Sequence, residues 1–117
     1  MGLIKVIVQK TQAITGVTGT SFSDAISLGG ALTVSAQPVQ SAVTGLSGAT
    51  AILQISNDSE GVTPTNWDDY GTSQNVTASG ALFFEKINPT GNWLRIKLTT
   101  NAGSYNSSVT FVVKGPN

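Results

Sequence analysis

The chain has 117 residues, of which 39% are hydrophobic and 10% charged, and its six basic and six acidic side chains balance at neutral pH. This length predicts one domain with a single core. Zero net charge excludes the broad positive field that nonspecific nucleic-acid binding requires, and the lack of cysteine excludes disulfides and thiolate chemistry. The apolar run in "MGLIKVIVQK" is too short for a signal peptide or a membrane span. We therefore expect neither a nucleic-acid nor a membrane partner.

The first thirty residues predict one clear strand followed by an irregular segment. In "LIKVIVQ", period-two alternation places Ile4, Val6 and Val8 on one face. The stretch that follows, "TQAITGVTGTSFSDAISLGGA", is rich in Gly, Ser and Thr and carries one aromatic and one charged residue. Residues 1–30 are therefore expected to form either an extended arm that pairs with a neighbouring subunit or two ordinary edge strands.

Three further strands are predicted in the middle of the chain. The runs "ALTVSA", "ATAILQIS" and "ALFFEKI" each alternate between apolar residues and residues of the opposite face. In the third run, Leu82 and Phe84 are expected on the core face, and Phe83, Glu85 and Ile87 on the opposite face of the same strand. The residues expected to face the core are Leu32, Val34, Ala36, Ala49, Ala51, Leu53, Ile55, Leu82 and Phe84.

The clearest alternation lies near the C-terminus, in "WLRIKLT" and "SVTFVVKG". Apolar side chains occupy one face of each run, and Trp93, Arg95 and Lys97 occupy the opposite face of the first. We expect the two runs to pair as an antiparallel hairpin through the polar connection "TNAGSYN".

Stretches rich in turn-forming residues separate these runs. "TGVTGT", "TGLSG", "NDSEGVTPTN" and "NPTGN" are examples, whereas helix-type periodicity is nearly absent. Strands of five to eight residues at this spacing predict an all-β fold, an antiparallel β-sandwich of jelly-roll or immunoglobulin-like type with about seven to nine strands. The sandwich is expected to span residues 1–117 as one domain.

The chain contains no histidine, which removes Ser-His-Asp and Cys-His arrangements and the commonest zinc ligand. An enzyme built on this chain would depend on carboxylates, lysine, tyrosine or serine. One such enzyme would be a small glycoside hydrolase with a carboxylate pair beside Trp67 or Tyr70. We expect instead no enzymatic activity, no catalytic residue and no cofactor.

Four of the six acidic residues cluster in "NDSEGVTPTNWDDYG". The interpretation that we prefer is a long hairpin loop whose charges keep it solvated and whose bends are shaped by Gly61 and Pro64. The alternative is a calcium site, since calcium accepts carboxylate oxygens in loose geometry, although the spacing does not match an EF-hand. The ligands in that alternative would be Asp58, Glu60, Asp68 and Asp69.

The face that carries Trp93, Arg95 and Lys97 has three interpretations. A stacking platform for single-stranded nucleic acid would need more aromatic residues and a positive field. An outer face would lay its long cationic side chains over apolar neighbours. A protein contact would use Trp and Arg as residues favoured at interface hot spots. We expect an outward face that contacts a neighbour.

The segment from about residue 50 to 115 resembles a pattern of tailed-phage virion proteins. A strand is followed by "SNDSEG" and "NWDDYG", then by "ALFFEKI", and then by "NWLRIKLTTNAG" and "SVTFVVKG". This order is similar to the small β-sandwich modules of capsid decoration proteins, head fibres and other virion accessory proteins of tailed bacteriophages. The resemblance implies a non-enzymatic virion protein, made in the host cytoplasm, that binds the major capsid protein or another virion protein and forms homo-oligomers.

Composition favours the same function, because low charge reduces repulsion between packed copies while hydroxyl groups keep the free subunit hydrated. We therefore expect a capsid decoration or cement protein that stabilises the phage head. The alternative is a carbohydrate-binding or fibre-tip adhesion module in which Trp67 and Tyr70, with or without calcium in the acidic loop, would recognise the glycan. The residues expected to bind the partner are Leu3, Ile4, Val6, Ile7, Val8, Trp93, Arg95 and Lys97.

Overall fold

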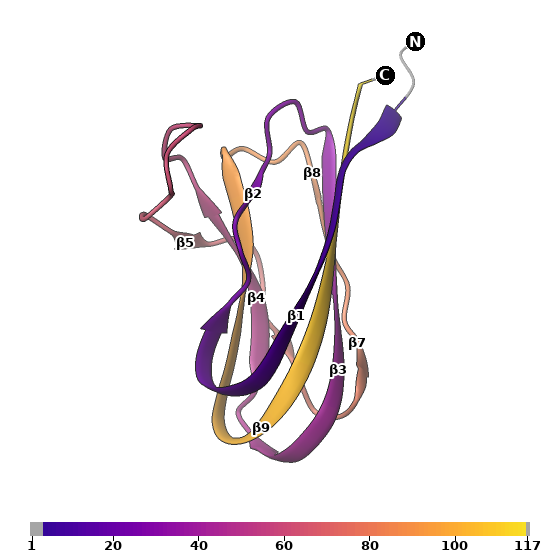
Figure 1. Cartoon of the computed structure of the whole chain (residues 1–117), viewed down its shortest axis with the longest axis vertical. Helices are drawn as coiled ribbons and strands as arrows, with labels where there is room; N and C mark the ends of the chain where they lie inside the picture. Colours follow the sequence, from indigo (N-terminus) through magenta and orange to yellow (C-terminus); the bar gives the residue numbers. More distant parts are fainter. Residues whose placement is uncertain (1–3, 117) are drawn as a thin grey trace.

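A computed structural model describes residues 4–116. This part of the chain is entirely β-structure and turns, so it contains no helix that could cross a membrane. All strand pairing is antiparallel, and the predicted all-β antiparallel sandwich class and strand number are confirmed (Figure 1). The nine strands are β1 (Ile4–Phe22), β2 (Ile26–Ser27), β3 (Thr33–Ser47), β4 (Thr50–Ser56), β5 (Asp68–Asp69), β6 (Gln74–Asn75), β7 (Gly80–Ala81), β8 (Phe84–Ile87) and β9 (Trp93–Pro116).

Strand β9 forms the middle of the sheet along its whole length. Strands β1 and β2 pair with one edge of β9, and β3 and β4 pair with the other. Val109, for example, lies between Gln12 and Pro38 in the register. The N-terminal strand and the β3–β4 segment therefore run parallel to each other, with the last strand of the chain between them.

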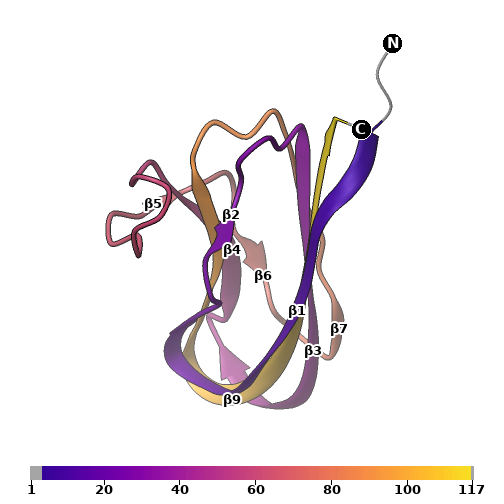
Figure 2. The same ribbon diagram turned by 45° about the horizontal axis from the view of Figure 1, so that its top comes forward.

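The single sheet folds back on itself at one end, which produces two facing layers (Figure 2). The first layer contains residues 4–14 of β1 and 106–116 of β9, together with β3 and its edge partners β7 and β8. The second layer contains residues 93–100 of β9, the end of β1, and β2, β4, β5 and β6. The long strands pass from one layer to the other, as happens at the corners of some sandwiches.

Residues with positive φ bend the long strands at this corner. Gly103 of β9 has a φ of 76° and Gly45 of β3 has a φ of 58°, in the left-handed region that glycine adopts without a steric penalty. The expectation that "TGVTGT" separates two short strands was therefore wrong, since all of its residues lie inside β1. "TGLSG" does separate β3 from β4, but only at its last residue, Gly48, because its first four residues extend β3. A bend in a continuous strand and a turn between two strands require the same residue types.

The hairpin expected between residues 93–99 and 108–115 does not form. Both segments belong to β9, and both edges of each segment are already paired with other strands. Lys97, for instance, lies between Phe22 and Ile52. The segments share the core, as expected, but they do so from opposite layers and not as hydrogen-bonded neighbours.

The core lies between the two layers and follows the predicted alternation at most positions. Leu32, which was expected to face the core, is instead 37% exposed. Leu94, Ile96 and Leu98 are completely buried, and Phe84 is 7% exposed while the adjacent Phe83 is 53% exposed. The core residues are Val17, Ile26, Leu28, Val34, Ala36, Ala49, Ala51, Leu53, Val76, Phe84, Leu94, Ile96, Leu98, Tyr105, Val109, Phe111 and Val113. Burial of these apolar side chains is the main stabilising term of the fold.

The N-terminal strand departs from its predicted alternation because of a bulge. The register with β9 shifts between Val6 and Val8, so Val6 lies opposite Lys114 on the outer face while Val8 lies opposite Val113 and packs against the core. The expectation that Ile4, Val6 and Val8 share one face was therefore wrong. Residues 4–22 pair with β9 of the same chain, so this part of the segment considered as an arm is integral to the sheet.

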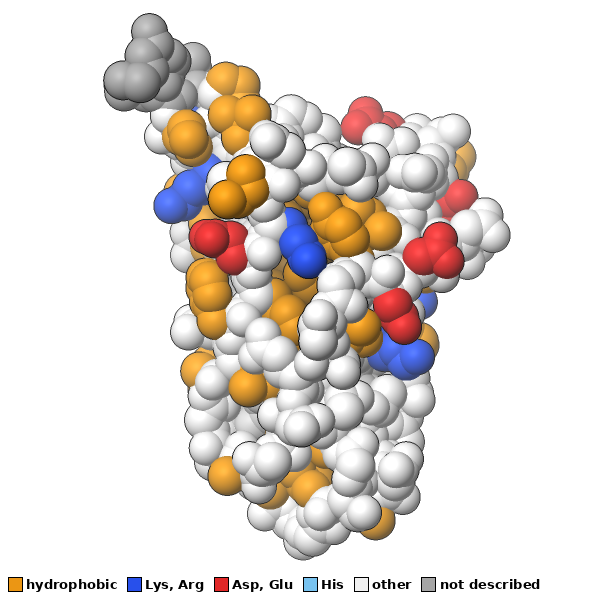
Figure 3. All heavy atoms as spheres, turned by 180° about the vertical axis from the view of Figure 1, so that it is seen from behind, with side chains coloured by type: hydrophobic (Ala, Val, Ile, Leu, Met, Phe, Trp, Pro, Cys, Tyr) orange, Lys and Arg blue, Asp and Glu red, His pale blue; other side chains and the backbone are white. Residues whose placement is uncertain are grey.

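Charged and uncharged residues are distributed unevenly along the long axis of the molecule, which measures 48 Å. No charged residue occurs in 25–57 or 98–113, two segments that include the corner residues of β3, β4 and β9. Viewed from behind, one half of the surface carries almost all of the charged side chains, and the corner half is mainly uncharged (Figure 3). The corner half is therefore a surface of small polar and apolar groups.

Candidate functional site

The outer face of the second layer contains the predicted residues Trp93, Arg95 and Lys97. Directly opposed residues of antiparallel strands lie on the same face. The register therefore puts Gln54 beside Arg95 and Asp69 beside Gln54, across β9, β4 and β5. On the other side of β9, Phe22 lies opposite Lys97. The three predicted residues thus do face outward together, as period-two alternation required.

Arg95 is held by two aromatic rings that reach it from opposite sides of β9. Its guanidinium carbon lies 3.8 Å from the centre of the Phe22 ring and 4.3 Å from the centre of the Trp67 ring. Phe22 ends β1, whereas Trp67 precedes β5 beyond the neighbouring strand. Stacking of a guanidinium on aromatic faces is favourable because the cation meets the negative face of each ring.

A chain of hydrogen bonds through Gln54 and Asp69 also fixes the side chain of Arg95. The Arg95 Nε donates to Gln54 Oε1 at 2.9 Å, and Gln54 Nε2 donates to Asp69 Oδ1 at 3.0 Å. Gln54 is buried, so its orientation is well defined. We name the set of Phe22, Gln54, Trp67, Asp69 and Arg95 the Arg95 cluster.

The Arg95 cluster leaves the charge of its arginine without an acidic partner inside the described chain. The salt bridge found in residues 4–116 joins Lys10 to Asp24 at 3.5 Å. The carboxylate of the cluster, Asp69, accepts from Gln54 and not from Arg95. Partial burial lowers the pKa of Arg95, because removal of water disfavours the charged form.

Trp93 lies at the border of this face and contacts the long loop that follows β4. Its indole Nε1 donates to the Ser59 carbonyl oxygen at 3.3 Å. A groove of about 450 Å³ runs beside it, lined by Ala25, Gly61, Val62, Thr63, Pro64 and Trp93. Trp93 therefore connects the outer face with the loop and is only partly accessible itself.

The loop from 57 to 67 joins β4 to β5, which pair in an antiparallel manner, so the preferred interpretation as a hairpin loop is confirmed. Asp58 organises this loop through three hydrogen bonds: the backbone N–H groups of Thr65 and Asn66 donate to Oδ2 at 2.7 and 2.9 Å, and Asn66 Nδ2 donates to Oδ1 at 3.0 Å. These donors, with the Asn66 side chain first, lower the pKa of Asp58 to about 2.

The four acidic residues considered as calcium ligands are not brought together. In the part of the chain that the structure describes, no group of three or more acidic side chains is placed to hold a metal ion. Asp58 is occupied inside the loop, and Asp69 is hydrogen-bonded to Gln54. Glu60 and Asp68 are exposed. Asp58, whose pKa is lowered, therefore has a structural role: it holds the acidic loop together through its hydrogen bonds.

The second predicted group, at the N-terminus, forms an exposed strand edge. Ile4, Val6 and Ile7 are 55%, 48% and 37% exposed, whereas Val8 is half-buried against the core. Among the described residues, β1 pairs with β9 alone, so its other edge is unpaired. Leu3 lies outside the described residues. An unpaired edge flanked by exposed apolar side chains is a template for strand addition.

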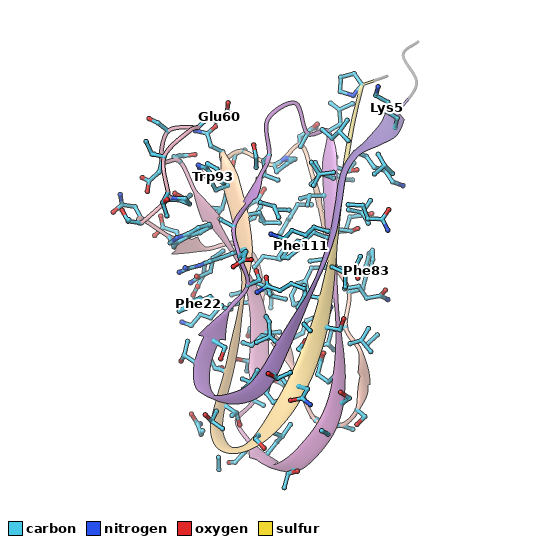
Figure 4. The ribbon with its side chains drawn as sticks, viewed as in Figure 1. Lys5, Phe22, Glu60, Phe83, Trp93 and Phe111 are labelled. Carbon is cyan, nitrogen blue, oxygen red and sulfur yellow. The ribbon has the colours of Figure 1, made fainter. Side chains whose placement is uncertain are left out.

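The two predicted groups do not form one surface. Trp93 and Lys5 lie near the same end of the molecule but on different sides of it (Figure 4). Residues 4–10 belong to the first layer and residues 93–97 to the second. The structure therefore presents two separate candidate contact regions, the β1 edge and the Arg95 cluster.

Phe22 and Gln54 are members of the cluster that sequence reasoning missed. Phe22 lies in "TGTSFSDA", where no alternation marks its face, and its neighbour Lys97 is distant in sequence. Gln54 interrupts the apolar run "AILQIS", and a polar residue inside such a run could have indicated a buried hydrogen-bonding role. The contacts of Phe22 and of Gln54 with Arg95 both depend on the register between neighbouring strands, which local sequence patterns do not reveal.

A comparison with models of known protein families and a comparison with curated proteins each find no match for this chain.

Proposed function

We propose that this chain is a non-enzymatic structural protein of a tailed-phage particle, a decoration or cement protein that binds the major capsid protein and stabilises the head. The observation that carries this proposal is the unpaired edge of β1 with its exposed apolar residues Ile4, Val6 and Ile7. A strand edge of this kind gains hydrogen bonds and buries apolar area when another chain adds to it. On a symmetric shell the same contact is repeated at every site.

The charge distribution supports attachment in many copies. The corner half is mainly uncharged (Figure 3), and the net charge is zero, so closely packed copies repel each other little. The abundant hydroxyl and amide groups of the corner half keep this surface hydrated in the free subunit. We propose that further copies of the chain and the capsid surface are its partners in the particle.

The β1 edge also carries features that oppose uncontrolled strand addition. Lys5 and Lys10 lie on this strand, and the bulge near Ile7 interrupts its flat edge. Charges and bulges on edge strands limit aggregation. A partner must therefore match this edge in charge and shape, as a specific capsid site would.

Point substitutions on β1 test the role of its edge better than a deletion of residues 1–10 would. Removing residues 1–10 would take away part of a strand that pairs with β9, and loss of binding could then follow from loss of folding. We expect the double variant Ile4→Ser and Val6→Ser to occupy purified particles of the encoding phage less than the wild type. The matched control is Ile87→Ser, which is 70% exposed but lies on β8, a different strand edge. Equal occupancy of all three proteins would reject the role of the β1 edge.

The alternative, a carbohydrate-binding or fibre-tip adhesion module, has less support. Its candidate sugar-stacking residues were Trp67 and Tyr70. Trp67 already stacks on Arg95, and Tyr70 packs against the core while Lys86 lies 4.7 Å from its ring centre. Binding to a glycan array that is lost in Trp67→Ala, with folding intact, would favour this alternative over the decoration protein.

A further inference from the structure

We propose that the Arg95 cluster is a docking site for a carboxylate of a partner protein, so that an acidic segment of that partner lies across the outer face of the second layer. This inference rests on the proposed function, since it names the chemistry by which a particle protein would be recognised. The contact is separate from the β1 edge.

Arg95 is already held in position before a partner binds. Phe22 and Trp67 restrict its guanidinium at 3.8 and 4.3 Å, and Gln54 accepts from its Nε at 2.9 Å. Arginine side chains normally lose considerable rotamer freedom on binding, and a side chain fixed beforehand avoids most of that cost. Arginine is also one of the residue types that are enriched at interface hot spots.

The two terminal nitrogens of Arg95 have no hydrogen-bond partner among residues 4–116, and no carboxylate there forms a salt bridge with them. Because Nε already donates to Gln54, these two terminal nitrogens are the donors of Arg95 that remain available to a partner. A guanidinium presents such donors in a planar fork that matches the two oxygens of a carboxylate. Partial burial strengthens the attraction, because less water screens the charge.

The surroundings of the Arg95 cluster also favour an acidic protein segment. Lys97 follows Arg95 on the same face and adds a second cation, and Phe22 is 43% exposed beside it. A partner segment with one or two carboxylates and an apolar neighbour would complement these groups. A sugar ring fits less well, because Phe22 and Trp67 each already give one face to the guanidinium. The occupant that the geometry favours is therefore an acidic protein segment.

A titration with a defined probe tests the site without knowledge of the partner. We would add an acetylated hexaglutamate peptide at low salt and follow the indole N–H resonance of Trp67, with Trp93→Phe as the background to remove the second indole signal. We expect a saturable shift that a neutral Gly-Ser hexapeptide does not produce. Arg95→Gln should weaken the affinity about tenfold or more, as expected for a charge-assisted pair.

Two further variants separate this site from a general charge effect. Lys97→Gln removes the same charge from the same face and should weaken binding only about twofold to threefold, since its contribution is that of a screened surface charge. Arg95→Lys keeps the charge without the planar fork and should fall between Lys97→Gln and Arg95→Gln. Absence of a saturable shift, equal affinities for wild type and Arg95→Gln, or tighter binding of polygalacturonate than of hexaglutamate would overturn the proposal.

Occupancy of purified particles distinguishes failure of this inference from failure of the proposed function. If the wild type occupies particles and Arg95→Gln occupies about tenfold fewer sites at limiting protein concentration, the proposal is supported. If both occupy particles equally, the proposal fails and the decoration function stands. If the wild type is absent from particles, the proposed function fails, and the peptide titration decides the carboxylate site by itself.

Discussion

Phe22 and Trp67 approach the guanidinium of Arg95 from opposite sides of β9, with ring centres 3.8 and 4.3 Å from its central carbon. Three segments that are far apart in the sequence thereby meet on one outer face of the sheet. The arrangement depends on β9 lying between β1 and β4, because β1 carries Phe22 on one side of Arg95, and β4 pairs on the other side with β5, which Trp67 directly precedes. A change in strand order would separate them.

The Phe22–Arg95 contact should be measurable as a coupling free energy. In a double-mutant cycle of Phe22→Ala and Arg95→Ala, followed by urea unfolding, we expect a coupling of about 0.5–1 kcal/mol, the usual contribution of a partly exposed cation–π pair. The control cycle joins Phe22→Ala with Lys114→Ala, whose residue lies on the first layer, and should give no coupling. A Phe22–Arg95 coupling that does not exceed this control would mean that the stack is not energetically significant.

Gly103 should tolerate no side chain, because of its position at the corner of the sheet. A methyl group there would overlap the carbonyl oxygen of Thr44 and the backbone of Gly45, and the φ of 76° already disfavours other residues. We expect Gly103→Ala to lower the free energy of unfolding by about 3 kcal/mol or more, from combined backbone strain and overpacking.

Gly45 provides the matched control for Gly103. Its φ is 58°, but a methyl group would meet no atom within 4 Å. Gly45→Ala should therefore cost only about 1 kcal/mol, the penalty of the left-handed conformation. Both variants can be compared by urea denaturation, and equal costs would contradict the close approach of β3 and β9 at the corner.

Adjacent phenylalanines on one edge of the first layer test the alternation of faces. Phe84 is 7% exposed and belongs to the core, so Phe84→Ala should lower the free energy of unfolding by about 3–5 kcal/mol. Phe83 is 53% exposed, and Phe83→Ala should cost less than about 1 kcal/mol. Thermal or chemical unfolding of the two variants gives the comparison. The reverse order of costs would show that the strand is turned over.

Asp58 should make the stability of the loop depend on acid pH. Its pKa is about 2 in the folded chain, below the ordinary value of 3.8, because Asn66 and Thr65 donate hydrogen bonds to the charged form. A depressed pKa stabilises the folded state at pH values above the ordinary pKa, and this contribution is lost as the pH falls from about 4 to about 2. Carbon NMR titration of the Asp58 carboxyl group should give a midpoint near 2.

Asn66→Ala checks the cause of the Asp58 shift. It removes the side-chain donor, the largest contribution, and leaves the two backbone donors in place. The Asp58 midpoint should therefore rise towards the ordinary value without reaching it. A midpoint near 4 in the wild type would instead show that Thr65 and Asn66 do not donate these hydrogen bonds to Asp58 in solution.

The sequence was sufficient for the fold class because alternation records the burial of each face directly. Leu94, Ile96 and Leu98 are buried and Arg95 and Lys97 face outward, as period two requires. Alternation does not record which strands are neighbours, and glycine-rich stretches do not reveal whether a chain reverses or bends. For this reason the continuity of β9 could not be predicted.

The candidate site was only partly predictable for the same reason. Trp93, Arg95 and Lys97 were recognised as one face because they are close in sequence. Phe22 reaches Arg95 through cross-strand pairing, and a bulge near Ile7 redirects Val8 to the core. Both effects depend on the register between distant segments, which local patterns do not contain.

The proposed function requires this chain to be present on purified particles of an encoding phage, so its amount on such particles is the most direct test. Quantitative mass spectrometry of gradient-purified particles gives the number of copies relative to the major capsid protein. A decoration protein requires a fixed ratio that is reproduced between preparations and restored when stripped particles are incubated with the purified wild type. Absence of the chain from particles, or a trace amount that varies between preparations, would contradict the proposal.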